Sequence, residues 1–385
     1  MLSARTAWDR TPNRLTRLLE ERRARGAPVL DLTLSNPTQA GIPYPPDLLA
    51  PLADAAAIPY EPSPLGLPAA RAAAAADFAR RGVQVEPAHV VITASTSEAY
   101  AFLFKLLCDP GDEVLVPRPS YPLFEYLAGL ESVATRPYAL RFDGEWHASP
   151  GALEHAVTPR TRALVTVHPN NPTGSFLKRG EAAALLAFCA ERELALVSDE
   201  VFADYAFAAD ARRFPTAAAG GPALAFALGG LSKSCGLPQV KVGWMAVAGP
   251  PALRAEALAR LEIVADTALS VSTPAQRALP ALLARREELQ APIRARVQAN
   301  RAWLSARLPG TAASWPGAEG GWYAALRVPA HVPDEERVLG LLDTRGVLVH
   351  PGFFFDFEAE GHLVASLLAR EADFRAGIEA LLDVL

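Results

Sequence analysis

Short apolar strands that alternate with longer helices are the feature that most constrains the fold of this chain. Residues 97–111, between the first two predicted strands, carry apolar positions at helical spacing, and so do residues 179–193, between the last two. Strand–helix alternation predicts an α/β fold with a largely parallel sheet and helices on both faces. In such a sheet, polar residues just past the carboxyl ends of the strands are the site candidates. The four compact β-branched runs are HVVITAS (89–95), DEVLVPRP (112–119), RALVTVHP (162–169) and LALVSDE (194–200).

The composition excludes several classes of protein. The 385 residues include 37 Lys and Arg against 42 Asp and Glu, so the formal net charge is −5 and no basic excess is available to neutralise nucleic-acid phosphates. Half of the residues are hydrophobic and 21% are charged, which is typical of a globular chain rather than a disordered one. We therefore expect a globular protein with no nucleic-acid partner.

The cysteines and the N-terminal segment bear on location. Cys108, Cys189 and Cys235 lie far apart, are odd in number and form no CxxC pair, so we expect neither a disulfide framework nor a metal site. The first 26 residues are basic but hold no apolar core of signal-peptide length. No apolar run reaches the roughly 18 residues that a membrane span requires. The sequence predicts a cytoplasmic protein without a membrane segment.

The pattern of predicted helices and strands changes after about residue 270. A long helical stretch over residues 273–308 leads to the compact segment GGWYAALRVP (320–329), and a helix, the strand GVLVHPG and a C-terminal helix follow. This pattern is typical of a smaller α+β domain joined to the first domain by a helix. We expect three parts: an N-terminal arm (1–40) that packs with the small domain, a large domain (41–270) and a small C-terminal domain (271–385).

Three short motifs follow the predicted strands. The turn NNPTG (170–174) comes directly after the third strand, so that the amide of Asn171 projects towards the sheet edge. The next strand ends in Asp199, which brings a carboxylate to the same edge. Further along, the segment GGLSKSCGLPQVKVGW places Lys233 in a Gly- and Ser-rich loop, where a lysine is a candidate nucleophile.

Taken together and in order, NNPTG, SDE, SK and VGW make the chain resemble the fold-type I pyridoxal-phosphate enzymes of the aminotransferase class I/II group. The resemblance extends over nearly the whole chain, from LSNPT (34–38) to HPGFF (350–354). It implies a large cofactor-binding domain with a mostly parallel sheet, a smaller α+β domain and the cofactor pyridoxal 5′-phosphate.

The resemblance also implies roles for individual side chains. Lys233 forms the Schiff base with the cofactor and then carries the proton between substrate and cofactor, which needs an amine with a pKa below about 10.4. Asp199 pairs with the pyridine nitrogen and keeps it protonated. Asn171 donates to the phenolic oxygen of the cofactor, and Tyr121 in PRPSYPLF stacks on the ring.

The cofactor phosphate requires its own binding site. The strand that ends at Ser95 leads into a helix, and the N–H groups at a helix N-terminus together with the hydroxyls of Ser95, Thr96 and Ser97 form an anion site. Ser95 also serves as a helix cap. Lys241 matches the basic phosphate ligand of the family, and Tyr60 matches a tyrosine that reaches the phosphate of the neighbouring subunit. The resemblance thus implies a homodimer.

Three cofactor contacts depart from the family pattern. Phe202 stands where the family usually has a tyrosine that hydrogen-bonds the phenolic oxygen. Gly230 replaces a frequent serine, although Ser232 is kept as a phosphate ligand. Lys241 replaces an arginine, which retains the charge but loses the bidentate fork. These changes weaken the cofactor contacts without removing the chemistry.

A fourth departure concerns the substrate. The family pattern ends in a Gly-aromatic-x-Arg-x-Ser strand whose arginine binds the substrate carboxylate, and here Val364 occupies the position of that arginine. A valine cannot reproduce a bidentate ion pair. His362 is a candidate substitute, because two positions apart on a strand places both side chains on one face. Asn36 and Tyr323 are further candidates on the substrate side.

We expect an aminotransferase that exchanges an amino group between an amino acid and a 2-oxo acid by a ping-pong mechanism. The same cofactor also serves β-lyases and decarboxylases, and the missing arginine keeps those alternatives open. A pyridoxal-phosphate-binding regulator without catalysis is the remaining alternative, and retention of Lys233 and Asp199 argues against it.

Overall fold

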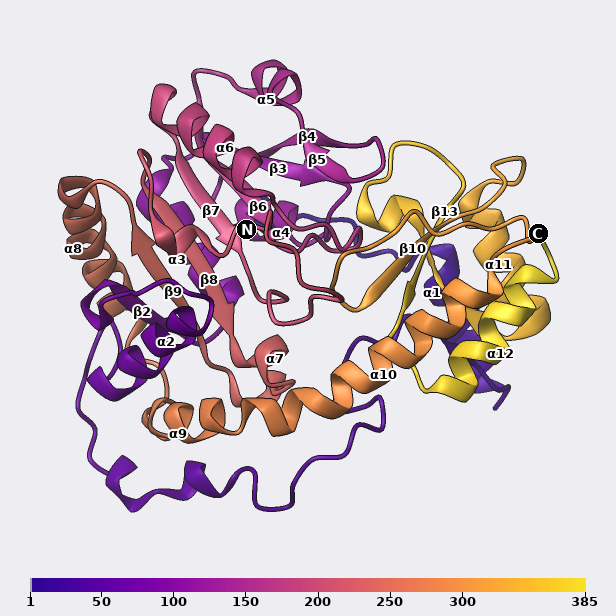
Figure 1. The fold of residues 1–385 in the computed structure, drawn as a ribbon, viewed down its shortest axis with the longest axis horizontal. Helices are drawn as coiled ribbons and strands as arrows, with labels where there is room; N and C mark the ends of the chain where they lie inside the picture. Colours follow the sequence, from indigo (N-terminus) through magenta and orange to yellow (C-terminus); the bar gives the residue numbers. More distant parts are fainter. Residues whose placement is uncertain (1) are drawn as a thin grey trace.

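The computed structural model describes residues 2–385 and shows two domains that lie side by side (Figure 1). A large domain contains an eight-stranded sheet, and a smaller domain contains helices from the N-terminal and C-terminal parts of the chain. The helix α10 (Arg286–Arg307) runs along the bottom of the view from one domain to the other. None of the helices within residues 2–385 is long and apolar enough to cross a membrane.

The large sheet has the strand order β2-β9-β8-β7-β6-β3-β4-β5. The pairs formed by β3 with β4 and β6, by β6 with β7, and by β7 with β8 are parallel, whereas β9 is antiparallel to both of its neighbours and β5 is antiparallel to β4. The predicted α/β fold with a mostly parallel sheet is therefore confirmed. The strands are β2 (Val90–Thr93), β3 (Glu113–Arg118), β4 (Ala134–Phe142), β5 (Trp146–Ala148), β6 (Thr161–Val167), β7 (Ala195–Asp199), β8 (Ala225–Gly230) and β9 (Gly243–Ala248).

Helices cover both faces of this sheet because successive strand residues point to opposite sides. Ile92 of β2 belongs to the apolar cluster that includes residues of α2, α6 and α9 on one face, while its neighbour Val91 belongs to the cluster that includes residues of α3, α4 and α8 on the other. Each face therefore has its own apolar core. The helices of this domain are α2 (Pro68–Arg80), α3 (Thr96–Leu107), α4 (Phe124–Leu130), α5 (Pro150–Ala156), α6 (Arg179–Glu191), α7 (Leu231–Ser234), α8 (Pro251–Ala268) and α9 (Thr273–Ala284).

The small domain is built from both ends of the chain. Its N-terminal strand β1 (Leu30–Asp31) pairs in parallel with β11 (Val347–Leu348), and α1 (Arg14–Ala24) packs on α11 (Asp334–Arg345). A second, antiparallel sheet places β13 (His362–Ser366) between β10 (Tyr323–Arg327) and β12 (His350–Pro351). The C-terminal helix α12 (Glu371–Leu382) covers β1 and packs on α10.

The long helical stretch after residue 270 is divided between the two domains. We predicted one helical stretch that opens the small domain at residue 271, but α9 ends at Ala284 and packs on α2 of the large domain. Within α10, Leu289 belongs to the apolar core of the large domain and Ile293 to that of the small domain. We therefore propose to move the domain boundary from residue 271 to about residue 290, inside α10.

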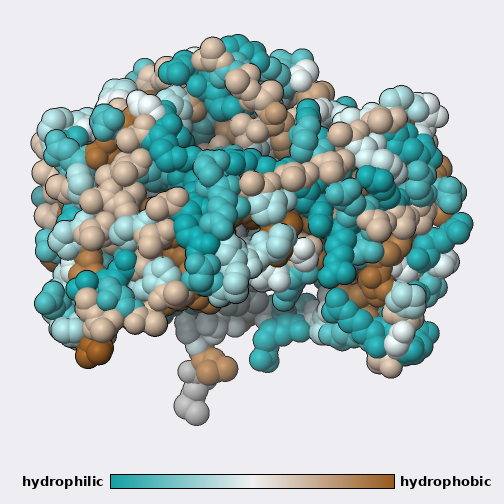
Figure 2. All heavy atoms as spheres, turned by 60° about the horizontal axis from the view of Figure 1, so that its bottom comes forward, coloured by the Kyte–Doolittle hydropathy of each residue, from teal (hydrophilic) through white to brown (hydrophobic). Residues whose placement is uncertain are grey.

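The outer surface shows no broad apolar face in the view that includes α9 and α10. Figure 2 shows hydrophilic atoms over most of this face, with apolar atoms in separate groups among them. A helical surface that crosses between two domains and remains exposed to water on one side is expected to be mixed in this way.

We predict that Asn300→Leu destabilises the small domain. The fully buried amide Nδ2 of Asn300 donates to the carbonyl oxygens of Leu367 and Ala369, each at 2.8 Å. A leucine leaves the Leu367 oxygen buried without this donor and the Ala369 oxygen with only the 3.4 Å hydrogen bond from Arg296, at a cost of about 1–3 kcal/mol. Urea denaturation followed by circular dichroism measures this loss. Gln298→Leu, on the exposed side of the same helix, is the control, and equal midpoints for the two variants would contradict the prediction.

Candidate active site

The carboxyl ends of the central strands open into a cavity of about 220 Å³. The side chains that line it come from the start of α3, from the loops after β6 and β7, and from α7. The cavity thus lies at the sheet edge that the sequence indicates. Of the predicted site residues, it brings together Thr96, Ser97, Tyr121, Asn171, Asp199, Phe202, Lys233 and Tyr323.

Lys233 is held in α7, a single helical turn that follows β8. The hydroxyl of Tyr205 donates to the carbonyl oxygen of Lys233 at 2.8 Å, which fixes the backbone. The Nζ atom lies 5.2 Å from the ring centroid of Trp322 and 5.4 Å from that of Phe202. Burial lowers the pKa of Lys233, and the charge of Asp199 partly opposes this shift. The amine is therefore easier to deprotonate than an exposed lysine.

Asp199 ends β7 and is the acid of the cavity. Burial raises its pKa to about 6, while the N–H of Val201 and the hydroxyl of Tyr100 oppose the shift. The Val201 nitrogen lies 3.2 Å from Oδ1, and the Tyr100 hydroxyl donates to Oδ2 at 3.2 Å. A desolvated carboxylate with two fixed donors is aimed at the cavity and strongly favours a cationic partner.

Asn171 presents an unused polar group to the same space. Its Oδ1 is buried and has no hydrogen-bond partner among residues 2–385. The preceding Asn170 holds the turn instead, since its Oδ1 accepts from the hydroxyl of Thr173 at 2.9 Å. Burial raises the pKa of Tyr323 to about 12, and the neighbouring side chains of Ser35 and Asn171 oppose that shift. An amide held here without a partner is suited to contact a bound molecule.

The N-terminus of α3 forms the anion-binding end of the cavity. Ser95 is the N-cap, and its Oγ accepts from the N–H of Glu98 at 3.2 Å, so the structure gives it the capping role. The hydroxyl-bearing residues Thr96 and Ser97 line the cavity from the first turn. In the segment before Lys233, a β-carbon built on Gly230 would lie 3.9 Å from Oγ of Ser232. Helix N–H groups and hydroxyls at one end are suited to hold a phosphate.

Six predicted site residues are not among those that line the cavity: Ser95 and Ser232, which lie at the anion-binding end just described, and four others. Asn36 turns its Oδ1 to the backbone N–H and hydroxyl of Thr38, and its neighbour Ser35 lines the cavity instead. His362 stacks on Phe357 with 4.3 Å between ring centroids. The last two lie at the surface: Lys241 is exposed, and Tyr60 is 64% exposed.

Sequence reasoning missed Tyr100, Ser35 and Tyr205. Tyr100 sits in an apolar helix stretch, where an aromatic residue indicates core packing, and only the fold shows its hydroxyl on Asp199. Ser35 lies within the LSNPT motif, next to the residue that we selected. Tyr205 acts on a backbone carbonyl from a loop, and no local pattern indicates such a contact.

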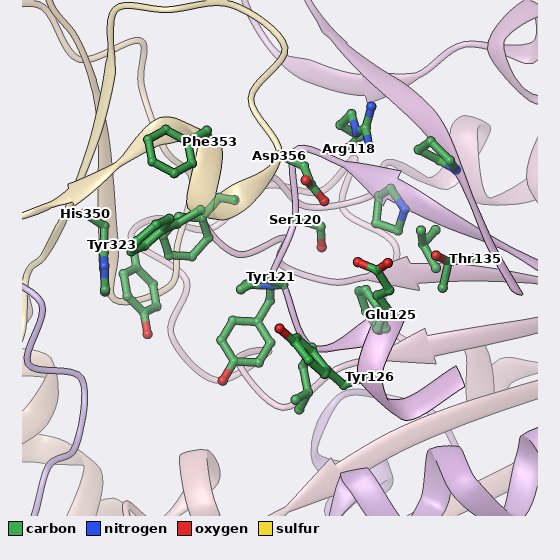
Figure 3. A pocket seen from close by; sticks show the side chains of 18 of the residues that line it. Arg118, Ser120, Tyr121, Glu125, Tyr126, Thr135, Tyr323, His350, Phe353 and Asp356 are labelled. Atoms are coloured by element: carbon green, nitrogen blue, oxygen red, sulfur yellow. The ribbon is translucent and has the colours of Figure 1, made fainter. Parts of the chain in front are cut away.

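A second, larger cavity of about 770 Å³ adjoins the first, and Ser35, Tyr121, Leu123, Phe124 and Tyr323 line both. Figure 3 shows its two sides: Tyr323, His350 and Phe353 project from the small domain, and Arg118, Glu125 and Thr135 from the large domain. The space between the domains is therefore continuous with the cavity that holds Lys233.

The chemistry of these donors fits pyridoxal 5′-phosphate. Lys233 offers an amine for its aldehyde, Asp199 a carboxylate for its ring nitrogen, and the N-terminus of α3 a site for its phosphate. Within residues 2–385, no group of three or more His, Cys, Asp or Glu side chains is arranged to hold a metal ion.

Comparison with known proteins agrees with this assignment. Residues 60–379 match the family model "Aminotransferase class I and II", and the chain belongs to this family. It is a pyridoxal-phosphate-dependent aminotransferase of fold type I, as predicted.

Several relatives are similar over most of their length. The aspartate/prephenate aminotransferase of Thermus thermophilus is 31% identical over 341 residues, which cover 85% of this chain and 83% of the relative. The glutamate-pyruvate aminotransferase AlaA of Escherichia coli is 28% identical over 365 residues, which cover 92% and 89%. In fold, the alanine aminotransferase from Pyrococcus furiosus matches 100% of this chain and 99% of its own with a TM-score of 0.90 at 24% identity.

We predict that Asp199→Asn stabilises the protein without cofactor at neutral pH while removing most of the turnover. The pKa of Asp199 rises from 3.8 to about 6 on folding. In the folded state this carboxyl group is therefore mostly charged only above a pH of about 6, and there its burial is costly. Removing that charge should stabilise by up to about 3 kcal/mol at pH 8, and the difference should fall to a small fraction of this by pH 4, because Asp199 is then protonated in the folded state and close to its unfolded pKa of 3.8. Thermal denaturation from pH 4 to pH 8 measures the difference. A pH-independent difference would contradict it.

Proposed function

We propose that Lys233 carries the ping-pong exchange of an amino group between an amino acid and a 2-oxo acid. The observation that carries this proposal is the placement of Lys233 and Asp199 in one cavity, where burial lowers the pKa of the amine and raises that of the acid. Groups whose environments shift their pKa values in this way are typical of catalytic pairs.

In this proposal Lys233 acts first as a nucleophile and then as a proton carrier. Its amine would attach the cofactor until the amine of the substrate takes its place. The freed lysine would then, as a neutral base, take the proton from the substrate's α-carbon and pass it on to the cofactor. The cofactor, when bound, supplies the electron sink that makes this carbon acidic. Because Tyr205 fixes the carbonyl of Lys233, the motion needed for proton transfer is confined to the lysine side chain.

Asp199 holds the ring nitrogen in its protonated form, and Tyr100 keeps the carboxylate oriented. Asn171 and Tyr121 line the same cavity, where Asn171 would contact the phenolic oxygen of the cofactor and Tyr121 would stack on its ring. Phe202 packs close to Lys233 without a hydroxyl, so we propose that Asn171 is the chief donor to that oxygen.

The phosphate end of the site is assigned to the backbone of α3 with the hydroxyls of Thr96, Ser97 and Ser232. Ser95 contributes through its cap, which holds the first turn of the helix in place. Lys241 has a left-handed backbone conformation with φ of 59° at the exposed edge beyond α7. We propose that it supplies positive charge to the phosphate from there.

We predict that Lys233→Ala abolishes transamination. Loss of both the nucleophile and the base should lower kcat by at least about 10⁴-fold, while the fold remains because Ala fits the single turn. The loss of the visible absorbance of cofactor-loaded protein reports the missing attachment, and a coupled assay of 2-oxo acid formation reports turnover. Lys105→Ala, on the exposed surface of α3, is the control. Turnover retained in Lys233→Ala would refute the assignment.

The proposed substrates are an amino acid and a 2-oxo acid. The names of the relatives cover alanine, glutamate with pyruvate, and aspartate with prephenate.

We propose a cytoplasmic location, because Cys108, Cys189 and Cys235 are all free thiols, as is usual in a reducing compartment.

We also propose that the active form is a homodimer in which Tyr60 reaches the phosphate site of the neighbouring subunit. Tyr60 and Ile58 are 64% and 83% exposed, and they lie on a segment that Ser270 anchors through a 2.8 Å hydrogen bond from the N–H of Ser63. Large side chains presented on an anchored segment favour a contact with another chain.

For Tyr60→Phe we predict weaker cofactor binding with an unchanged assembly. One hydrogen bond to a charged phosphate is lost, so the dissociation constant of the cofactor should rise by about 10-fold or more. Fluorescence titration measures the affinity, and sedimentation velocity measures the assembly. Tyr126→Phe, another exposed tyrosine, provides the control. A monomeric wild-type protein, or equal affinities for Tyr60→Phe and wild type, would contradict the proposal.

A further inference from the structure

Among the described residues that line the larger cavity there is one imidazole, that of His350 in the small-domain sheet. Across the antiparallel strands, Val364 of β13 lies opposite Ala325 of β10 and opposite His350 of β12. Directly opposed residues point to the same side of a sheet, so these three side chains form one row. Tyr323 lies two residues along from Ala325 on that same face and lines both cavities. His350 is therefore the polar member of a row that is otherwise aliphatic.

His350 is available to a bound molecule. It lines the cavity of about 770 Å³, and its Nδ1 is buried without a hydrogen-bond partner among residues 2–385. The ring is held by aromatic contacts, with centroids 5.8 Å from Phe354 and 5.6 Å from Phe355. A positioned imidazole with a free nitrogen in a cavity wall is suited to hydrogen-bond a ligand.

The cavities offer few other groups for a substrate carboxylate. Among the described residues that line them, the permanently or potentially cationic side chains other than His350 are Lys233 and Arg118. Lys233 is assigned to the amino group. Figure 3 shows Arg118 on the side of the cavity opposite His350 and Tyr323, beyond Ser120 and Asp356. The small-domain side thus presents no cation to a carboxylate.

The imidazole itself is uncharged at neutral pH. Burial lowers the pKa of His350 to about 4, although the charge of Asp31 opposes the shift. A neutral imidazole carries one N–H donor and one acceptor. It can donate to a carboxylate without forming an ion pair, and a hydrogen bond to a charged acceptor is stronger than one between neutral groups.

We propose that His350 is a specificity-determining residue that donates a hydrogen bond to the carboxylate of the amino acid substrate. This inference rests on the proposed function, since it takes an amino acid to be the substrate. The side chain of the substrate then lies against the aromatic wall formed by Phe353, Phe354 and Phe355. Carboxylate recognition in this protein is a neutral hydrogen bond within an apolar wall.

The test compares two ligands that differ only in the carboxylate and cannot react, because neither has an amino group. The cofactor-loaded protein is titrated with 3-phenylpropionate and with 3-phenylpropan-1-ol, and calorimetry gives the dissociation constants. We expect His350→Phe to weaken binding of the acid by about tenfold or more and to change binding of the alcohol by less than about twofold. His350→Gln, which keeps an N–H donor, should recover part of the affinity for the acid.

Controls separate this role from packing. His331→Phe makes the same change at an exposed position of the small domain and should leave both affinities unchanged. Equal losses for acid and alcohol in His350→Phe, no loss for either, or a selective loss in His362→Phe would overturn the proposal. If His350→Phe does not fold, the smaller His350→Leu gives the same comparison. Because binding is measured without turnover, absence of transamination in the wild-type protein would count against the proposed function alone.

Discussion

The enclosure of an amine and a carboxylate in one cavity is the constraint on which the rest of the structure depends. Lys233 and Asp199 are both desolvated, and the charge of each stabilises that of the other. Fixed donors from Tyr100 and Val201 also stabilise the carboxylate. Such a pair is costly unless the surrounding chain holds it in place. The parallel strands, with their carboxyl ends at one edge, supply that support, and the cofactor supplies the missing charge partner.

A buried network of charged groups underlies the site. Arg81 pairs with Glu200, the residue after Asp199, at 2.5 Å, and Arg286 pairs with Asp77 of α2. From α10, the amide of Gln290 donates to the backbone carbonyl of Ser234 at 2.6 Å, in the turn that carries Lys233. The catalytic turn is therefore held directly by Gln290 and by Tyr205. Gln290 also donates to Asp204, which Arg286 contacts, so the ion pair with α2 belongs to the same network and breaking it should disturb the turn.

The sequence predicted the elements better than the contacts between them. Periodicity located the central strands, and ordered motifs located Lys233, Asp199 and Asn171, because the backbone at a strand end determines where those side chains point. Contacts made across the fold left no local pattern, as for Tyr100 on Asp199. Alternation along the strand places His362 on the face of Val364, but it does not reveal that the ring stacks on Phe357. His350 lies on the neighbouring strand, and only the strand register brings it opposite Val364.

The pairing of β1 with β11 has a consequence for how the protein is made. Leu30 and Asp31 leave the ribosome early, but their partners Val347 and Leu348 are synthesised more than 300 residues later. Domains tend to fold in the order of their synthesis, and here the large domain can form first. The N-terminal arm must therefore wait with exposed apolar side chains until Val347 and Leu348 have been synthesised, and during this interval the nascent chain is open to chaperones and proteases.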